Sequence, residues 1–256
     1  MIATINIKGQ DYKVDLDHPL DISMPLKGGE GNASAWYVDA ISIEPVRNSA
    51  FTGSVEEGGS VNFRNIAFNP HGNGTHTECL GHITPKVYSI NQSLTRFFSL
   101  AKLITIDPIK GWNDDEFNSD DDLILSLEAI KNATNDQVEE SLIIRTLPNN
   151  DSKMHRNWSE SNWPQLDKRA AAWLAEKGVK NLLIDLPSVD REMDGGKLLS
   201  HHAFWRVPEN ERLDATITEM IYVVDSIEDG LYFLELQFAP FENDASPSRP
   251  VLYRFL

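Results

Sequence analysis

A predicted helix that runs directly into an apolar strand is the feature that most restricts what this chain can fold into. Residues 161–178 offer a capping residue, Ser161 or Asn162, and end at Gly178, which can adopt the left-handed conformation that stops a helix. Apolar side chains would line one face of this helix: Leu166, Ala170, Trp173 and Leu174. Residues 179–190 follow as a short apolar run typical of a buried strand. Helix, tight turn and buried strand indicate an α/β domain.

Further strand patterns occur along the whole chain. The segments concerned are residues 1–16, as two strands around a Gly turn, then 60–68, 99–109 and 141–146, and finally 216–241, as two strands around a turn at 225–230. The acidic segment 114–133 predicts a helix capped by aspartates, because negative side chains stabilise a helix N-terminus. A calcium loop is disfavoured there because its central glycine is missing. No linker divides the sequence, so we expect one domain spanning residues 1–256.

Charge and composition narrow the class of protein. The formal net charge of −16 argues against binding to nucleic acid or to an anionic membrane surface, since both would repel the chain. The single cysteine, Cys79, excludes an internal disulfide. The N-terminal residues lack the pattern of a signal peptide, and no apolar run approaches the roughly 20 residues that span a bilayer. A cytoplasmic location without membrane association is therefore expected.

Residues 69–83, NPHGNGTHTECLGHI, hold three of the seven histidines: His71, His76 and His82. If the backbone is extended after the glycines, His76 and Glu78 point to the same side, because side chains at i and i+2 share a face. Glycines allow the tight turn that would bring His71 beside them. Imidazoles and carboxylates that converge from separate segments are the ligands of divalent metals. The segment is therefore a candidate metal site.

A pair of adjacent histidines and a glutamate within an apolar strand lie further along the chain. His201 and His202 are adjacent, and Glu219 interrupts an otherwise apolar strand, where a buried charge needs a partner or a metal. Asp190, at the end of a predicted strand, either orients a ligating histidine or simply ends that strand. The alternative interpretation is a set of surface histidines with one partly buried glutamate. The residues alone leave both interpretations open.

The histidine-rich segment resembles the metal-binding motif of the cyclase family, which includes the bacterial-type kynurenine formamidases and isatin hydrolases. Their pattern is His-x-Gly-Thr-His-x-Asp-x-Pro-x-His, in which Gly74-Thr75-His76 matches the centre and His82 the last histidine. Other segments are similar to the family in the same order along the chain: LDISMPL at 20–26, LIIRT at 142–146, PSVDREMDGGKLLSHH at 187–202 and ITEMIY at 217–222. This shared order is more specific than any one of the segments.

Three departures from the motif set this chain apart. Gly72 occupies the position of the first histidine, with His71 one residue early, so a shifted turn is needed for His71 to substitute. Glu78 replaces the aspartate and reaches one methylene further. Leu80 replaces the proline. These changes indicate a divergent branch of the family.

The resemblance implies the family's swivelling β/β/α fold, with a mixed sheet core and flanking helices, and a site for one or two divalent ions, with zinc ahead of manganese. His71, His76 and Glu78 would bind the first ion. Glu78 and Glu219 would bridge to a second ion held by His201, which is preferred to His202 because the family's ligand is usually the first of the pair.

The resemblance also implies a reaction. A metal-bound water would attack the carbonyl of a small amide, formamide or lactone, with His82 as general acid and base and Trp36 as an aromatic wall for the substrate. A homo-oligomer, dimer or tetramer, is expected because family members are commonly oligomeric. The alternative function is a degenerate family member that binds a small ligand without catalysis, suggested by the missing first histidine.

Overall fold

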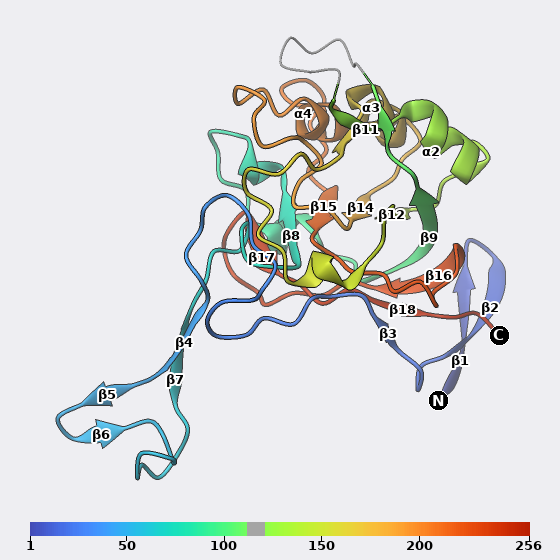
Figure 1. Cartoon of the computed structure of the whole chain (residues 1–256). Helices are drawn as coiled ribbons and strands as arrows, with labels where there is room; N and C mark the ends of the chain where they lie inside the picture. Colours follow the sequence, from blue (N-terminus) through green and yellow to red (C-terminus); the bar gives the residue numbers. More distant parts are fainter. Residues whose placement is uncertain (112–120) are drawn as a thin grey trace.

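The computed structural model describes residues 1–111 and 121–256. Its body is a nine-stranded mixed sheet that curls, so that β16 and β18 run across the direction of β8 and β9 (Figure 1). In spatial order the strands are β17 (Ala245–Pro247), β8 (His76–Cys79), β15 (Thr216–Glu219), β14 (Asn181–Ile184), β12 (Ser141–Thr146), β9 (Phe98–Ile106), β16 (Gly230–Glu235), β18 (Val251–Tyr253) and β3 (Leu20–Asp21). The predicted α/β fold is confirmed.

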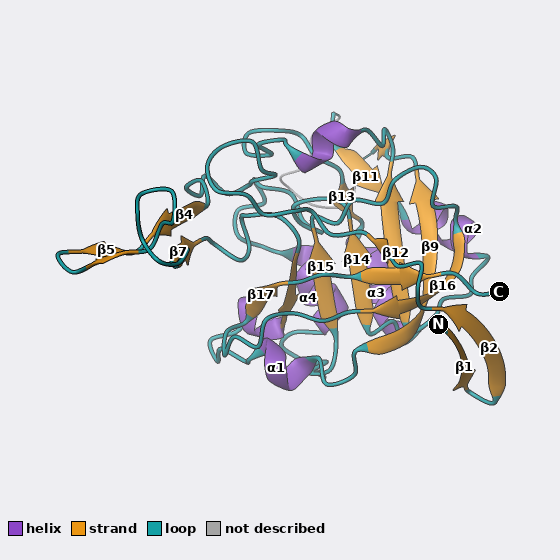
Figure 2. Ribbon diagram, turned by 90° about the horizontal axis from the view of Figure 1, so that it is seen from below, coloured by secondary structure: helices purple, strands orange, loops and turns teal. Residues whose placement is uncertain are grey.

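The sheet separates two apolar layers. Its centre is the parallel set β9, β12, β14 and β15. Successive side chains of a strand point to opposite faces, so Leu142 and Ile144 pack in one cluster with residues of the helices α2 (Leu127–Thr134), α3 (Lys168–Glu176) and α4 (Leu199–Trp205). These three helices are labelled in Figure 2. Ile143 lies in the layer on the other face, beside α1 (Ile90–Ser93). Burial on both faces explains why these strands have nearly continuous apolar sequences.

The helix predicted at 161–178 begins later than expected. Residues Gln165–Leu166 form β13, which pairs with β11 (Leu123–Leu125) in a small separate sheet with β10 (Ile109–Lys110). The Asp167 carboxylate caps α3 by accepting a hydrogen bond from the Arg169 amide, so the predicted caps at Ser161 or Asn162 are wrong. Gly178, at φ +85°, has the predicted left-handed conformation after the helix. Tertiary strand pairing has overridden the local signal at the N-terminal end.

The helix predicted in the acidic segment is also shorter than expected. Part of the segment, up to residue 120, lies outside the described residues. In the described part, β11 separates the aspartates from α2, and the Ser126 hydroxyl caps the helix by accepting from the Ala129 amide. The predicted aspartate cap is therefore wrong, because residues 123–125 form a strand instead of the first turn of the helix.

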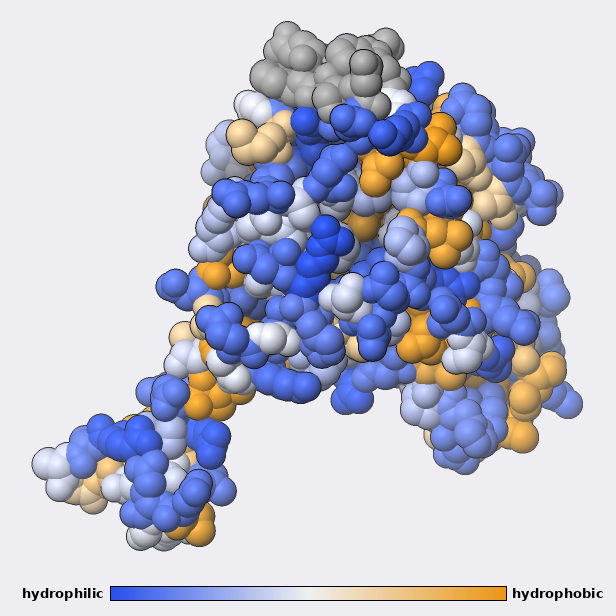
Figure 3. All heavy atoms as spheres, viewed as in Figure 1, coloured by the Kyte–Doolittle hydropathy of each residue, from blue (hydrophilic) through white to orange (hydrophobic). Residues whose placement is uncertain are grey.

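Two hairpins extend the body. The predicted N-terminal pair is confirmed as β1 (Ile2–Ile7) and β2 (Gln10–Asp15), which pack on the sheet through Val14. Residues 42–67 form an arm that projects away from the body, built from β4 (Ser42–Pro45), β5 (Arg47–Asn48), β6 (Phe51–Thr52) and β7 (Arg64–Ala67) (Figures 1 and 3). The strand predicted at 60–68 exists only as the shorter β7.

The two strands predicted within 216–241 exist as β15 and β16, but they are not neighbours, because β14, β12 and β9 lie between them. Short 3-10 turns at Leu80–His82 and Asp151–Met154 complete the described elements. Within those described ranges, no helix has both the length and the apolar character that crossing a membrane requires.

Candidate metal centre

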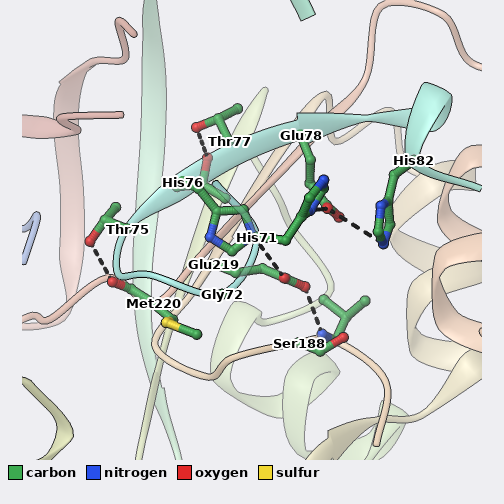
Figure 4. A network of polar contacts seen from close by, with 12 residues as sticks. His71, Gly72, Thr75, His76, Thr77, Glu78, His82, Ser188, Glu219 and Met220 are labelled. Carbon is green, nitrogen blue, oxygen red and sulfur yellow. Dashed lines mark hydrogen bonds and ion pairs between the residues drawn. The ribbon is translucent and has the colours of Figure 1, made fainter. Parts of the chain in front are cut away.

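The centre is built on the pairing of β8 with β15. Their antiparallel register sets His76 directly opposite Glu219. Because side chains alternate along a strand, Glu78 shares the face of His76. Cys79 lies in the apolar layer on the other side of the sheet, and its buried thiol contacts a backbone carbonyl. The register thus gathers one imidazole and two carboxylates on a single face (Figure 4).

The turn before β8 brings His71 to this face. Gly74 has φ +76°, a conformation that favours glycine, and a Cβ there would lie 2.5 Å from the end of the Leu26 side chain, which would have to move. The Thr75 hydroxyl donates to the Met220 carbonyl and accepts from the Met24 amide at 2.8 Å, which ties the turn to the end of β15. His71 Nδ1 then lies 3.0 Å from Glu78 Oε2 (Figure 4).

Two more imidazoles complete the cluster. His82 ends the 3-10 turn after β8, with Nε2 3.9 Å from Glu78 Oε2. His201 projects from α4, with Nε2 3.0 Å from Glu78 Oε1 and 3.8 Å from Glu219 Oε1. The ring of His202 instead faces the Val207 carbonyl at 3.3 Å, away from the cluster. The structure therefore brings together every residue that the sequence suggested as a ligand except His202.

Each candidate ligand imidazole has one nitrogen held by an acceptor outside the cluster. His76 Nδ1 lies 3.0 Å from the Gly74 carbonyl, His201 Nδ1 lies 2.6 Å from Asp190, and His71 Nε2 lies 2.8 Å from Asp244. A proton on each of these nitrogens leaves the lone pair of the other nitrogen directed at the two glutamates. Histidines that bind metals in proteins are oriented in this manner.

One polar atom in the cluster is buried without a hydrogen bond. His76 Nε2 is fully buried and makes no hydrogen bond, although Glu219 Oε2 lies 3.4 Å away. An unpaired buried polar nitrogen costs about 1–3 kcal/mol, so a ligand that accepts its lone pair would remove that penalty. A divalent cation fits the donor set, since imidazole nitrogens and carboxylate oxygens are what zinc and similar ions bind.

The titrating groups are strongly coupled. Burial alone would raise the pKa of Glu78, but the surrounding imidazoles of His82, His201 and His71 hold it well below its usual range. Burial opposes protonation of His71, yet its hydrogen bonds to Asp244 and Glu78 raise the pKa of this imidazole to about 10. The two carboxylates beside His201 likewise raise its pKa well above the ordinary value, against the effect of burial. The neighbouring carboxylates therefore favour the protonated forms of His71 and His201.

Asp244 is the residue that sequence reasoning missed. It lies just before β17, and its carboxylate contacts His71 and, at 3.5 Å, His82 Nδ1. The only signal available was an acid in a short polar stretch, FENDASPSRP, after the last long strand. Asp190 was suggested as an orienting residue, and the structure places its carboxylate against His201 as described above.

A cavity of about 320 Å³ opens onto the cluster. Its lining residues are Trp36, Val38, Asn69, His71, His82, Ser188, Leu198, His201 and Glu219. Trp36 packs edge-on against Trp163, with ring centroids 5.4 Å apart. Trp36, the residue expected to form an aromatic wall for the substrate, therefore lines this cavity.

Comparisons with known proteins agree with this architecture. The sequence profile of the cyclase family matches residues 14–191. The chain belongs to the cyclase family. The kynurenine formamidase of Bacillus cereus is 27% identical to this chain over 237 residues, which cover 91% of the chain and 96% of that protein. The kynurenine formamidase of Bacillus anthracis is 26% identical over 238 residues, with the same coverage.

Solved structures share the fold of this chain. A potential metal-dependent hydrolase with cyclase activity superposes with a TM-score of 0.60 at 17% identity, covering 93% of the chain and 98% of that structure. An isatin hydrolase bound to the product analogue thioisatinate superposes with a TM-score of 0.62 at 13% identity, covering 93% and 92%. The family and the fold expected from the motif are therefore both confirmed.

Proposed function

We propose that this protein is a metal-dependent hydrolase of a small amide, formamide or lactone. The observation that supports this most is the convergence of three oriented imidazoles on two buried glutamates at the bottom of an open cavity. The hydrolase names of its relatives point to the same chemistry. His71, His76 and Glu78 would hold a first ion, while Glu78, Glu219 and His201 would hold a second. Zinc is the first candidate and manganese the second.

A divalent ion at this position would supply Lewis acidity, which lowers the pKa of a bound water and polarises a carbonyl oxygen. The two glutamates are nearly inaccessible to solvent, with side chains 1% and 4% exposed, so their charge acts at close range in a weakly polar environment. The Val189 amide donates to Glu219 Oε1 at 2.9 Å and fixes that carboxylate. The protein thereby keeps the donor atoms in place before substrate arrives.

His82 would transfer the proton. Its side chain is 31% exposed and lines the cavity, so it can reach both the cluster and a bound substrate. An imidazole can take a proton from water and return it to a leaving group near neutral pH. Trp36 would provide a flat apolar surface against a planar substrate, since its edge-on contact with Trp163 holds the ring in place.

The test is metal analysis of the purified protein combined with a panel of formamides, lactones and cyclic imides. We expect stoichiometric metal, turnover of at least one compound, and a loss of kcat of about 100-fold or more in His82→Ala with metal retained. His18→Ala, at a fully exposed histidine remote from the centre, is the matched control. A centre that stays empty in excess zinc would favour the non-catalytic binding protein instead, and metal without turnover on the panel would contradict hydrolysis.

We also propose that the whole chain, residues 1–256, acts as one cytoplasmic domain and forms a homo-oligomer, a dimer or tetramer. The arm of residues 42–67 projects from the body (Figure 3). It supports an oligomer, because four large apolar side chains of the arm are exposed: Val55, Val61, Phe63 and Ile66. Exposed apolar groups of this kind mark interaction surfaces. Light scattering on the protein and on Phe63→Ser/Ile66→Ser would test this; a monomeric parent protein would contradict it.

A further inference from the structure

Asp244 is held in place by the backbone around it. β17 pairs with β8, and the Cys79 amide donates to the Asp244 carbonyl at 3.0 Å. The neighbouring Asn243 carbonyl accepts from the Ile90 amide at 2.8 Å. The first bond joins the segment to β8, which carries Glu78, and the second joins it to α1. The Asp244 side chain therefore extends toward the cluster from a rigid support.

A single carboxylate oxygen of Asp244 contacts two histidines. Oδ2 lies 2.8 Å from His71 Nε2 and 3.5 Å from His82 Nδ1. The two rings stack with centroids 4.2 Å apart and planes 28° apart, so both present a nitrogen to the same oxygen. In the described part of the chain, the ion pairs of this carboxylate are with these two imidazoles. Its side chain is 16% exposed, which limits competition from water.

The Asp244 carboxylate selects which nitrogen carries the proton in the rings of His71 and His82. An acceptor at Nε2 of His71 leaves its Nδ1 lone pair facing Glu78, where a metal ligand is needed. An acceptor at Nδ1 of His82 leaves its Nε2 facing the cluster, where a proton must be taken. Outer carboxylates set ring tautomer and orientation in this way in other metal sites.

We propose that Asp244 is a positioning residue that simultaneously aligns the ligand His71 and the proton-transfer residue His82. This inference rests on the proposed function, because it assigns those roles to the two histidines. The shared oxygen makes the two roles dependent on each other: loss of Asp244 weakens metal binding and slows turnover in the same variant. It also gives the C-terminal segment, beyond the part that the family profile matches, a direct role in the site.

The test compares Asp244→Ala, which removes both contacts, with the isosteric Asp244→Asn, which keeps one acceptor oxygen. Glu242→Gln is the matched control, since that carboxylate belongs to the same segment but bonds Asn91 on the surface. Three quantities are measured: zinc affinity by chelator competition, kcat and KM at saturating zinc, and the tautomer of each histidine ring by nitrogen NMR. Thermal unfolding checks that the variants fold, and Asp244→Asn replaces the alanine variant if that one does not.

We expect Asp244→Ala to bind zinc about 10–100-fold more weakly, as removal of an outer carboxylate does elsewhere. At saturating zinc, kcat should fall at least tenfold with KM little changed, and the His82 proton should move from Nδ1 to Nε2. Asp244→Asn should give smaller effects of the same kind, and Glu242→Gln none.

Three results would overturn the proposal. Zinc affinity, kcat and tautomers like those of the parent protein would remove any positioning role. A loss in zinc affinity or in kcat alone would mean that Asp244 serves one histidine only. Loss of a whole equivalent of bound metal would make Asp244 a ligand of its own site with His71 and His82. The affinity and tautomer measurements need no substrate, so they remain decisive even if the parent protein proves inactive and the proposed function fails.

Discussion

At the scale of single residues, the centre depends on where each imidazole directs its second nitrogen. His201 and His202 are adjacent in sequence and chemically identical, yet only the first is fully buried beside the glutamates. The difference arises because successive residues of a helix point about 100° apart. Asp190 then fixes the His201 ring by accepting from its Nδ1 and from two backbone amides.

The histidine pair provides a direct test of this assignment. We expect His201→Ala to lose zinc affinity by more than the roughly 10–100-fold typical of outer partners, because a ligand itself is removed. His202→Ala, its matched control, should keep zinc and activity, since the hydrogen bond of its ring goes to the Val207 carbonyl and not to the cluster. Zinc titration against a chromophoric chelator measures both. Equal losses in the two variants would contradict the assignment of His201.

At the scale of elements, the turn before β8 and the ends of the central strands position the site. The turn favours glycine, and the strand ends are fixed by buried polar contacts. Asp185, after β14, accepts from the Thr146 amide at 2.8 Å and pairs with Lys153 at 2.8 Å. Both side chains of this pair are almost fully buried.

The turn is tested by Gly74→Ala with Gly196→Ala as control. Both glycines have φ near +75°, but only a Cβ at Gly74 meets another side chain. We expect Gly196→Ala to cost about 1–2 kcal/mol of unfolding free energy from backbone strain alone. Gly74→Ala should cost more and should also weaken metal binding, because His71 and His76 flank the turn. Denaturant unfolding and metal titration measure the two effects; equal costs would show that the contact with Leu26 is easily relieved.

Removing Lys153 should leave a buried charge unpaired. We expect Lys153→Met to lower the unfolding free energy by about 3–5 kcal/mol at neutral pH. Lys180→Met, which breaks the exposed pair with Asp214, should cost at most about 1 kcal/mol.

The loss in Lys153→Met should also depend on pH. Burial raises the pKa of Asp185, and Lys153 partly offsets this, so the variant raises it further. A folded-state pKa above the unfolded value means that ionisation opposes folding at high pH. The destabilisation should therefore shrink as the pH falls through the raised value. Urea unfolding at several pH values measures this, and a loss independent of pH would contradict it.

At the scale of the whole molecule, segments that are far apart in the sequence meet at the centre. β8, α4, β15 and the residue before β17 each contribute one or more groups. An ion that binds only the folded state stabilises it by about 2.7 kcal/mol when its concentration is 100 times Kd. Metal binding should therefore increase the unfolding free energy of the whole protein.

We expect zinc to raise the Tm of the protein and a chelator to lower it. The gain should be retained in His82→Ala, whose role is proton transfer, and largely lost in His76→Ala, which removes a fully buried candidate ligand. Differential scanning calorimetry at fixed protein concentration measures the shift. A Tm that does not respond to zinc would contradict a structural link between the metal and the fold.

Local patterns were sufficient for much of this protein. Alternation after Gly74 predicts that His76 and Glu78 share a face, and the apolar runs predict the central strands. The motif and the order of the segments identify the family. The predictions were wrong at the N-terminal ends of two helices. The predicted caps of α2 and α3 are not used, because the residues before each helix form β11 and β13, which pair with each other. Helix propensity is a short-range signal, and such pairing overrides it.

What the sequence by itself determined was the set of chemical groups, their local faces and the kind of layers that bury them. Only the tertiary structure decided that His71 reaches Glu78, that His201 rather than His202 enters the centre, and that Asp244 meets His71 across 173 positions of the chain. The physical reason is that side-chain direction repeats over a few residues and can be inferred locally, whereas strand register between distant segments is set by packing of the whole core.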